Sequence, residues 1–171
     1  MIQRLIPVAA AILVSACSSY TPDPSATARL APTTGNSTNG TITFTQMGSF
    51  VQIHGEVRGL APNKYHGFHI HENGDCSSGD GMSAGGHFNP TKKQHGAHDG
   101  REKHAGDLVS LKADDKGIAH VKYIADSISI LDGESNVVGK GLIVHRDPDD
   151  YRTQPTGNSG PRIACAVITK N

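Results

Sequence analysis

The stretch TITFTQMGSFVQIHGEVRG, residues 41–59, alternates apolar and polar side chains on either side of a short glycine-containing segment. Alternation of this kind over several residues is typical of a β-strand that buries one face. We therefore predict two antiparallel strands, residues 41–47 and 49–59, with a hairpin turn at Met47-Gly48-Ser49.

Further strands are predicted along the rest of the chain. The segments KYHGFHIHE, DLVSLKAD, GIAHVKYIAD, GKGLIVH and RIACAVI occupy residues 64–72, 107–114, 117–126, 139–145 and 162–168. The 171 residues include 20 Gly and 9 Pro, which indicates many turns, and no amphipathic helix stands out. The sequence predicts a single all-β domain, either a β-sandwich or a flattened barrel.

Two long segments between the predicted strands, residues 73–106 and 146–161, lack apolar periodicity. Loops of this length in a compact domain are usually either functional or disordered. Because they contain few apolar residues with which to pack, we expect metal ions and a disulfide to order them.

The N-terminal residues 1–17, MIQRLIPVAAAILVSAC, have the pattern of a secretory signal and are too short to span a bilayer as a mature helix. The ending LVSAC resembles a bacterial lipobox, so Cys17 is predicted to carry lipid; an ordinary cleaved signal is the alternative. Ser18 favours sorting to the outer membrane, which predicts a periplasmic lipoprotein. Residues 18–40, rich in Ser, Thr and Pro, are expected to form a flexible tether before a folded domain at 41–171.

The chain has three cysteines, which is an awkward count for an exported protein. If Cys17 carries lipid, Cys76 and Cys165 remain. Export implies an oxidising compartment, so we expect these two to form a disulfide, with unlinked thiols as the alternative. Such a bond would tie the first long loop to the last strand.

Histidines are the most unusual feature of the composition, since the chain contains 10 of them at a formal net charge of +0. That charge indicates no nucleic-acid partner. His69 and His71 lie two positions apart in a predicted strand and therefore project from one face. Phe68 and Ile70 take the opposite face, which is the natural core face. His66 shares that face, and we interpret it as a hydrogen-bonded structural residue.

Other histidines could complete a metal site. Neutral imidazoles with one carboxylate and no thiolate suit both copper and zinc. Three His and one Asp make a closed tetrahedral zinc set, whereas four His can make a tetragonal copper set. The candidates in the first loop and at a strand end are His87, His95, His98, His104, Asp107 and His145. His54, His98 and His120 are expected to face solvent.

The motifs occur jointly and in order, and together they resemble copper/zinc superoxide dismutase in its bacterial exported form. They read GFHIHENGDC, GGHFNP, HAGDL, GLIVHRDPDD and TGNSGPRIACAVI, and the match covers residues 41–171. The resemblance implies a flattened Greek-key antiparallel β-barrel with one copper ion and one zinc ion per subunit. It also implies superoxide as the substrate and either a monomer or a homodimer.

Particular roles follow from motif position. The resemblance implies that four residues bind copper: His69, His71, His87 and His145. It implies that four bind zinc, with His87 shared: His87, His95, His104 and Asp107. Asp149 would hydrogen-bond His69 and His95, and Arg162 would guide and dock the anion. Thr156 and Gly157 are weaker candidates for narrowing the channel.

The implied reaction converts two superoxide anions and two protons to oxygen and hydrogen peroxide. Copper would alternate between Cu(II) and Cu(I) while His87 takes and returns a proton, in antioxidant defence of the cell envelope. The alternative is a non-catalytic copper- and zinc-binding envelope lipoprotein on the same fold. The cations that attract superoxide over long range stay open, with four candidates: Lys64, Lys92, Lys93 and Arg152.

Overall fold

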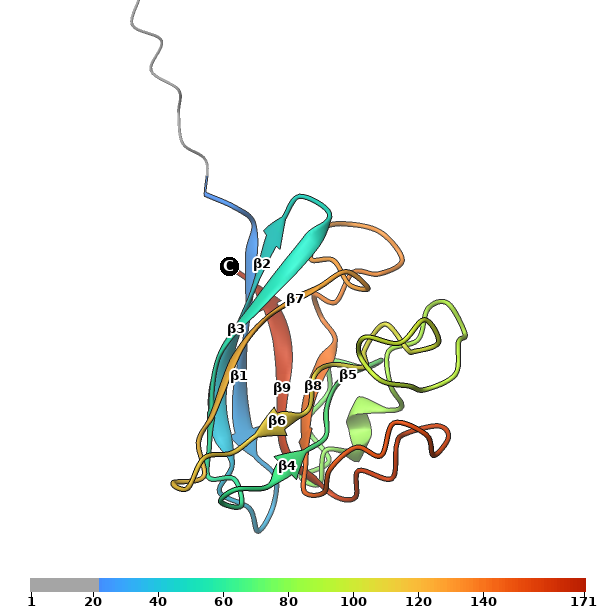
Figure 1. Cartoon of the computed structure of the whole chain (residues 1–171). Coiled ribbons are helices and arrows are strands. Elements are labelled where there is room, and N and C mark those ends of the chain that lie inside the picture. The colour runs from blue at the N-terminus through green and yellow to red at the C-terminus, as the bar shows by residue number, and fades with distance from the viewer. Residues whose placement is uncertain (1–21) are drawn as a thin grey trace, which may run out of the picture.

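The computed structural model describes residues 22–171, which form an antiparallel sheet curled into a half-barrel with long loops on one side (Figure 1). Seven strands are hydrogen-bonded in the order β5-β8-β9-β1-β2-β3-β7. Their bounds are β1 Ser25–Pro32, β2 Asn39–Met47, β3 Phe50–Arg58, β5 Phe68–His71, β7 Ala119–Ala125, β8 Gly141–His145 and β9 Arg162–Lys170. The prediction of an all-β antiparallel domain is confirmed.

A second, two-stranded sheet pairs β4 (Tyr65–His66) with β6 (Leu111–Lys112). It lies across the opening between β5 and β7, because β4 runs almost directly into β5 and β6 contacts β7. The single helical turn in the described residues is the 3-10 helix η1, Met82–Ala84, in the first long loop.

The predicted hairpin is present, with Met47 paired to Phe50 across the two-residue turn Gly48-Ser49. Gly48 has a φ of 62°, in the region that favours glycine, which is why a tight turn forms here. The alternating side chains of β2 and β3 place one apolar row inside the barrel.

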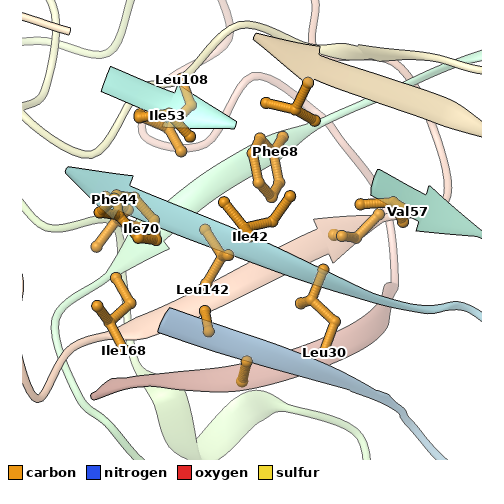
Figure 2. Close-up of a cluster of buried hydrophobic side chains, with 14 of the residues drawn as sticks. Leu30, Ile42, Phe44, Ile53, Val57, Phe68, Ile70, Leu108, Leu142 and Ile168 are labelled. Atoms are coloured by element: carbon orange, nitrogen blue, oxygen red, sulfur yellow. The ribbon is translucent and has the colours of Figure 1, made fainter. Parts of the chain in front are cut away.

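The core consists mainly of aliphatic side chains from several strands, together with the rings of Phe44, Phe68 and Phe88. Figure 2 shows part of this cluster. Ile42 and Phe44 on β2 meet Phe68 and Ile70 on β5, and the other strands add further members. These include Leu30, Ile53, Val57, Leu142 and Ile168. Since Phe68 and Ile70 face this core, the neighbouring histidines of β5 point out of the barrel towards the loops.

The predicted flexible tether is wrong for residues from Ser25 onward. Strand β1 lies between β2 and β9 and pairs with both along its length. Its alternating residues Ala26, Ala28 and Leu30 are buried in the core. The folded domain thus includes Ser25, well before the predicted start at Thr41. The proposed signal and Cys17 lie outside the described residues, and no helix in residues 22–171 has the length and apolar character that crossing a membrane requires.

Two predicted strands differ from the structure in length. The stretch 64–72 is interrupted at Gly67, whose missing Cβ leaves space for the Ser159 side chain. The backbone of Gly67 bonds to Asp147 and His145 instead of continuing a regular ladder. The stretch 107–114 forms a strand only at Leu111–Lys112, because Asp107 takes part in the histidine cluster described next.

Candidate metal centre

The two histidines of β5 are fully buried, although they face away from the barrel core. His69 and His71 are each 0% exposed, because the two long loops cover the outer face of β5. Both side chains project from one face of the strand, as predicted. Because the loops cover that face, the site is enclosed between the barrel and the loops.

One group of metal-binding side chains joins His69 and His71 to residues brought from elsewhere in the chain. His87 from the first loop and His145 at the end of β8 place a ring nitrogen within 4.8 Å of the other ligand atoms. An antiparallel bridge between His71 and His87 and the pairing of β5 with β8 bring these segments together.

Three rings in this group are each oriented by a hydrogen bond. In each case the bond is made by the ring nitrogen that points away from the other ligand atoms. The Nδ1 of His71 lies 2.9 Å from the Gly85 carbonyl, and the Nδ1 of His145 lies 3.0 Å from the Gly160 carbonyl. The Nε2 of His69 lies 2.7 Å from Asp149. Such outer contacts fix ring orientation and tautomer in metal sites.

The remaining nitrogens of this group are buried and lack a hydrogen-bond partner among the described residues. They are Nδ1 of His69 and Nε2 of His71, His87 and His145. Buried polar atoms are normally paired, so four converging unpaired acceptors need an occupant. Four imidazole nitrogens suit a copper ion, and this donor set therefore fits the metal that the sequence predicts.

A second group surrounds the carboxylate of Asp107. Its Oδ1 lies 2.9 Å from Nδ1 of His87, 3.0 Å from Nδ1 of His95 and 3.5 Å from Nδ1 of His104. Its Oδ2 accepts hydrogen bonds from the backbone of Gly96 and His104. Three imidazoles and one carboxylate form a closed set that suits tetrahedral zinc. His87 belongs to both groups, with one ring nitrogen in each.

Burial sets the protonation of the histidines around the first group. It lowers the pKa of His87 to about 4 and that of His145 to about 3, and the neighbouring histidines add to the effect. The pKa of His71 is also well below the usual value, chiefly through burial. These rings are therefore neutral near pH 7, which is the form that binds metal.

His95 behaves in the opposite way. Burial disfavours its charged form, but hydrogen bonds to the carboxylates of Asp107 and Asp149 outweigh burial and raise its pKa to about 9. Hydrogen bonds with His104, His87 and His95 hold the pKa of the Asp107 carboxyl below its usual value, against the effect of burial. Those with His69 and His95 do the same for the pKa of Asp149. The second group without metal thus attracts positive charge, as a cation site should.

Asp149 connects the two groups from the second long loop. Its Oδ2 lies 2.7 Å from Nε2 of His69, and its Oδ1 lies 2.9 Å from Nε2 of His95. Both contacts are those that the resemblance implied. Any Cβ on Gly157 would clash with this carboxylate, so only glycine allows the loop to close over it.

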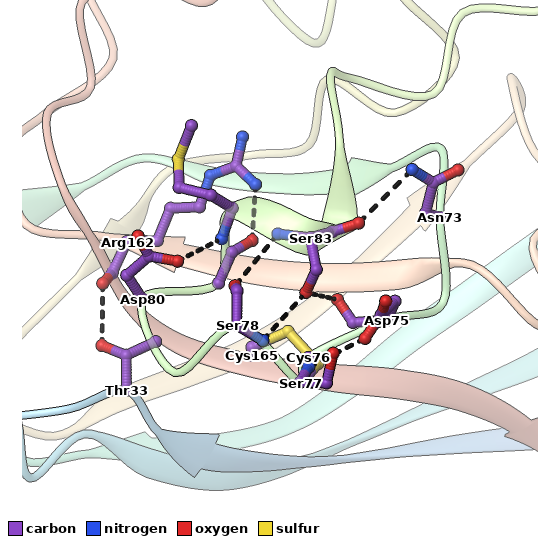
Figure 3. Close-up of a disulfide and its surroundings, with 12 residues drawn as sticks. Thr33, Asn73, Asp75, Cys76, Ser77, Ser78, Asp80, Ser83, Arg162 and Cys165 are labelled. Carbon is purple, nitrogen blue, oxygen red and sulfur yellow. Dashed lines mark hydrogen bonds between the residues drawn. A yellow bond between two sulfur atoms is a disulfide. The ribbon is translucent and has the colours of Figure 1, made fainter.

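Arg162 begins β9, and its side chain lies near the loop that contains the disulfide (Figure 3). Its Nη1 donates to the Gly81 carbonyl and its Nη2 to the Gly85 carbonyl, each at 2.6 Å. The Gly85 carbonyl also bonds His71, which fixes the half-buried guanidinium close to that ring. A positive charge is therefore held next to the four converging nitrogens, where a small anion would approach.

The disulfide between Cys76 and Cys165 is present, as expected (Figure 3). It joins residues 89 positions apart and attaches the loop that carries Gly81 and Gly85 to β9. Bonds of this kind typically stabilise a fold by about 2–4 kcal/mol. Because Arg162 lies on β9 just before Cys165, the disulfide and the two carbonyl contacts of Arg162 hold the same loop.

The histidines outside the two groups vary in their surroundings. His66 is buried, with its Nδ1 3.0 Å from the His145 carbonyl, in agreement with a structural interpretation. His54 and His120 are exposed as expected. The expectation for His98 is wrong, because the ring is half-buried and packs edge-on against Tyr123 with centroids 5.2 Å apart.

No motif in the sequence indicated a role for Gln154, which contacts the backbone of His95 twice. Its Oε1 accepts from the His95 N–H at 2.9 Å, and its Nε2 donates to the His95 carbonyl at 3.0 Å. A loop glutamine carries no motif, so only the three-dimensional contact reveals it. Through Gln154 and Asp149 the second long loop holds both the backbone and the ring of His95.

Replacing Gln154 with alanine should weaken zinc binding, because His95 would lose its backbone support. Loss of such an outer contact typically costs about 10- to 100-fold in metal affinity. Competition with a zinc chelator measures the effect, and Gln94→Ala, an exposed neighbour of His95, is the matched control. Equal zinc affinity in both variants would show that Gln154 does not support the site.

The fold and these two groups define a class: an all-β protein in which one buried histidine belongs to two adjacent groups of potential metal ligands. The chain matches the family model described as copper/zinc superoxide dismutase (SODC) over residues 38–168. It belongs to the copper/zinc superoxide dismutase family.

Individual relatives agree with this placement. The chain is 38% identical over 170 residues to superoxide dismutase (Cu-Zn) 2 of Aquifex aeolicus (strain VF5), covering 97% of this chain and 99% of the relative. It is 42% identical to an extracellular superoxide dismutase (Cu-Zn) of Caenorhabditis elegans, covering 75% of this chain but only 60% of that protein. A crystal structure of the clock protein EA4 matches with a TM-score of 0.78 and 36% identity, over 89% of this chain and 98% of the other.

Proposed function

We propose that the protein catalyses the conversion of two superoxide anions and two protons to oxygen and hydrogen peroxide. The observation that carries this proposal is the set of four converging, unpartnered imidazole nitrogens beside a fixed arginine. A bound copper ion supplies one-electron redox chemistry, which zinc cannot perform.

The proposed assignment divides the ligands at His87. His69, His71, His87 and His145 hold copper, and His87, His95, His104 and Asp107 hold zinc. Asp149 orients one ring of each set. The guanidinium of Arg162 attracts and docks the anion, because its charge is permanent and its donors are planar.

His87 has a further role in the proposed reaction. Its Nδ1 faces Asp107 and the zinc set, whereas its Nε2 faces the copper set and lacks a partner among the described residues. Nε2 would therefore alternate between binding the metal and holding a proton, and it would pass that proton to the reduced substrate. The zinc set keeps the ring in place during that transfer.

We also propose that the protein is exported and attached to the outer membrane through lipid on Cys17. The signal pattern of residues 1–17 and the Cys76–Cys165 disulfide support export, and the C. elegans relative is named as extracellular. The envelope is therefore the proposed site of antioxidant action.

The alternative of a non-catalytic metal-binding lipoprotein is not favoured, because both complete ligand sets, Asp149 and Arg162 are all retained.

Removing the metals and then restoring copper, zinc or both distinguishes catalysis from metal binding alone. We expect rapid superoxide removal only when copper is restored. A protein that regains both metals without any turnover would instead support the alternative.

A further inference from the structure

Four large apolar side chains are exposed at one end of the barrel, where β2 turns into β3. Met47, Phe50, Ile124 and Leu131 are 46%, 48%, 57% and 44% exposed. We call this region the hairpin end. Exposed apolar side chains that gather on one surface often mark a contact site.

Pairing and hydrogen bonds place these residues together. Met47 pairs directly with Phe50, and Ile124 pairs with Gln52, two residues from Phe50 on the same outer face of the sheet. Leu131 belongs to a loop that is held at the same end from the inner face of the sheet, since the Ile130 N–H donates to the buried Gln46 side chain at 3.0 Å.

The N-terminal segment enters the fold at the same end. The Gln46 N–H donates to the Pro24 carbonyl at 2.9 Å, and Ser25 pairs with Thr45. A fully extended chain from Ser18 to Pro24 reaches at most about 25 Å. A lipid anchor on Cys17 would thus keep the hairpin end within that distance of the bilayer.

We propose that the hairpin end lies against the surface of the bilayer, with Met47 and Phe50 inserted among the lipids. The inference rests on the proposed lipid on Cys17. A short tether raises the effective concentration of the surface beside the membrane, so a weak apolar contact becomes populated without strong intrinsic affinity. Aromatic and aliphatic side chains suit the boundary between headgroups and acyl chains.

The charges around the patch favour a contact with uncharged lipid. Asp126, Asp132 and Glu134 are exposed acidic residues on the adjoining loop segments. The exposed cations Lys122 and Lys170, and the ion pair of Asp126 with Lys103 at 3.7 Å, offset these carboxylates, so this end has no excess of positive charge to attract anionic headgroups. The apolar contact is therefore expected to form on zwitterionic phospholipid and to change little with ionic strength.

This orientation leaves the metal centre open to the substrate. Lys170 at the end of β9 pairs with Ala26 at the hairpin end, whereas Arg162 begins the same strand. Eight residue steps along a strand correspond to about 26 Å. Arg162 and the second long loop therefore lie towards the opposite end of the barrel, away from the bilayer (Figure 1).

The absence of Trp from the chain allows a direct test with single reporters. Two variants of the lipidated full-length protein, Phe50→Trp and Met82→Trp, are each bound to phosphatidylcholine vesicles. The acyl chains of these vesicles are brominated, so they quench the fluorescence of a Trp that inserts among them. Met82 is 60% exposed on the disulfide-linked loop and serves as the matched control. We expect the Phe50→Trp emission to shift to the blue and lose most of its intensity, while the Met82→Trp emission is unchanged.

The outcomes separate the two proposals. A Phe50→Trp protein that floats with the vesicles but is not quenched overturns the docking inference and leaves the lipid anchor standing. Failure to float overturns the anchor and the inference that rests on it. Met47→Trp provides a second reporter across the turn, and quenching there is also expected.

Discussion

Replacing His87 with alanine is expected to weaken the binding of both metals and to abolish the removal of superoxide. One ring nitrogen of His87 belongs to each group, so the substitution removes a ligand from both. Loss of an outer contact alone typically costs about 10- to 100-fold in metal affinity, and loss of a direct ligand should cost at least about 100-fold. Dialysis against a competing chelator, followed by metal analysis, measures both affinities.

Three matched variants make this test specific. His145→Ala should lose copper and keep zinc, because His145 belongs only to the first group. His104→Ala should lose zinc first, because it belongs only to the second. His54→Ala, at an exposed position outside both groups, should keep both metals. If His87→Ala lost only one metal, His87 would not be a shared ligand.

Reversing the charge of Arg162 gives the second largest expected effect. In Arg162→Glu the rate of superoxide removal should fall by about tenfold or more, because focused positive charge raises association rates of anions by about 10- to 1000-fold. Copper content should be retained, since Arg162 is not among the ligands. Rates measured across a range of ionic strengths should fall with salt in the unaltered protein and change less in the variant.

Arg162 also holds the first long loop through its two carbonyl contacts, so a control must separate the effect of its charge from an effect on loop position. Arg162→Lys keeps the charge but cannot donate to Gly81 and Gly85 with the same fork, so an intermediate rate is expected. Arg58→Glu reverses an exposed charge at the end of β3 and should leave the rate close to that of the unaltered protein. Unchanged turnover in Arg162→Glu would remove Arg162 from the mechanism.

Alternation of side chains was sufficient to predict most of the barrel. The pattern in residues 41–59 gave β2, β3 and their turn, because each strand buries one face of bulky side chains. The same reasoning missed β1, where the buried positions are mainly Ala26 and Ala28. Small alanines carry a weak apolar signal, and the Thr and Pro around them resemble a linker.

The metal centre was predictable only in part from local pattern. Strand geometry explains why His69 and His71 share a face, but it cannot bring His87 or His145 to them. Those residues come from a loop and a distant strand end, and only the resemblance connected them in advance. Contacts from a side chain to a backbone, such as that of Gln154 with His95, leave no signature in residue type and required the structure.

The most direct test of the central claim measures metal content and superoxide removal in one sample of the purified protein. We predict one copper and one zinc per chain, and a rate of superoxide removal that falls in proportion as copper is withdrawn while zinc stays bound. A sample that holds both metals yet removes superoxide no faster than buffer would contradict the account.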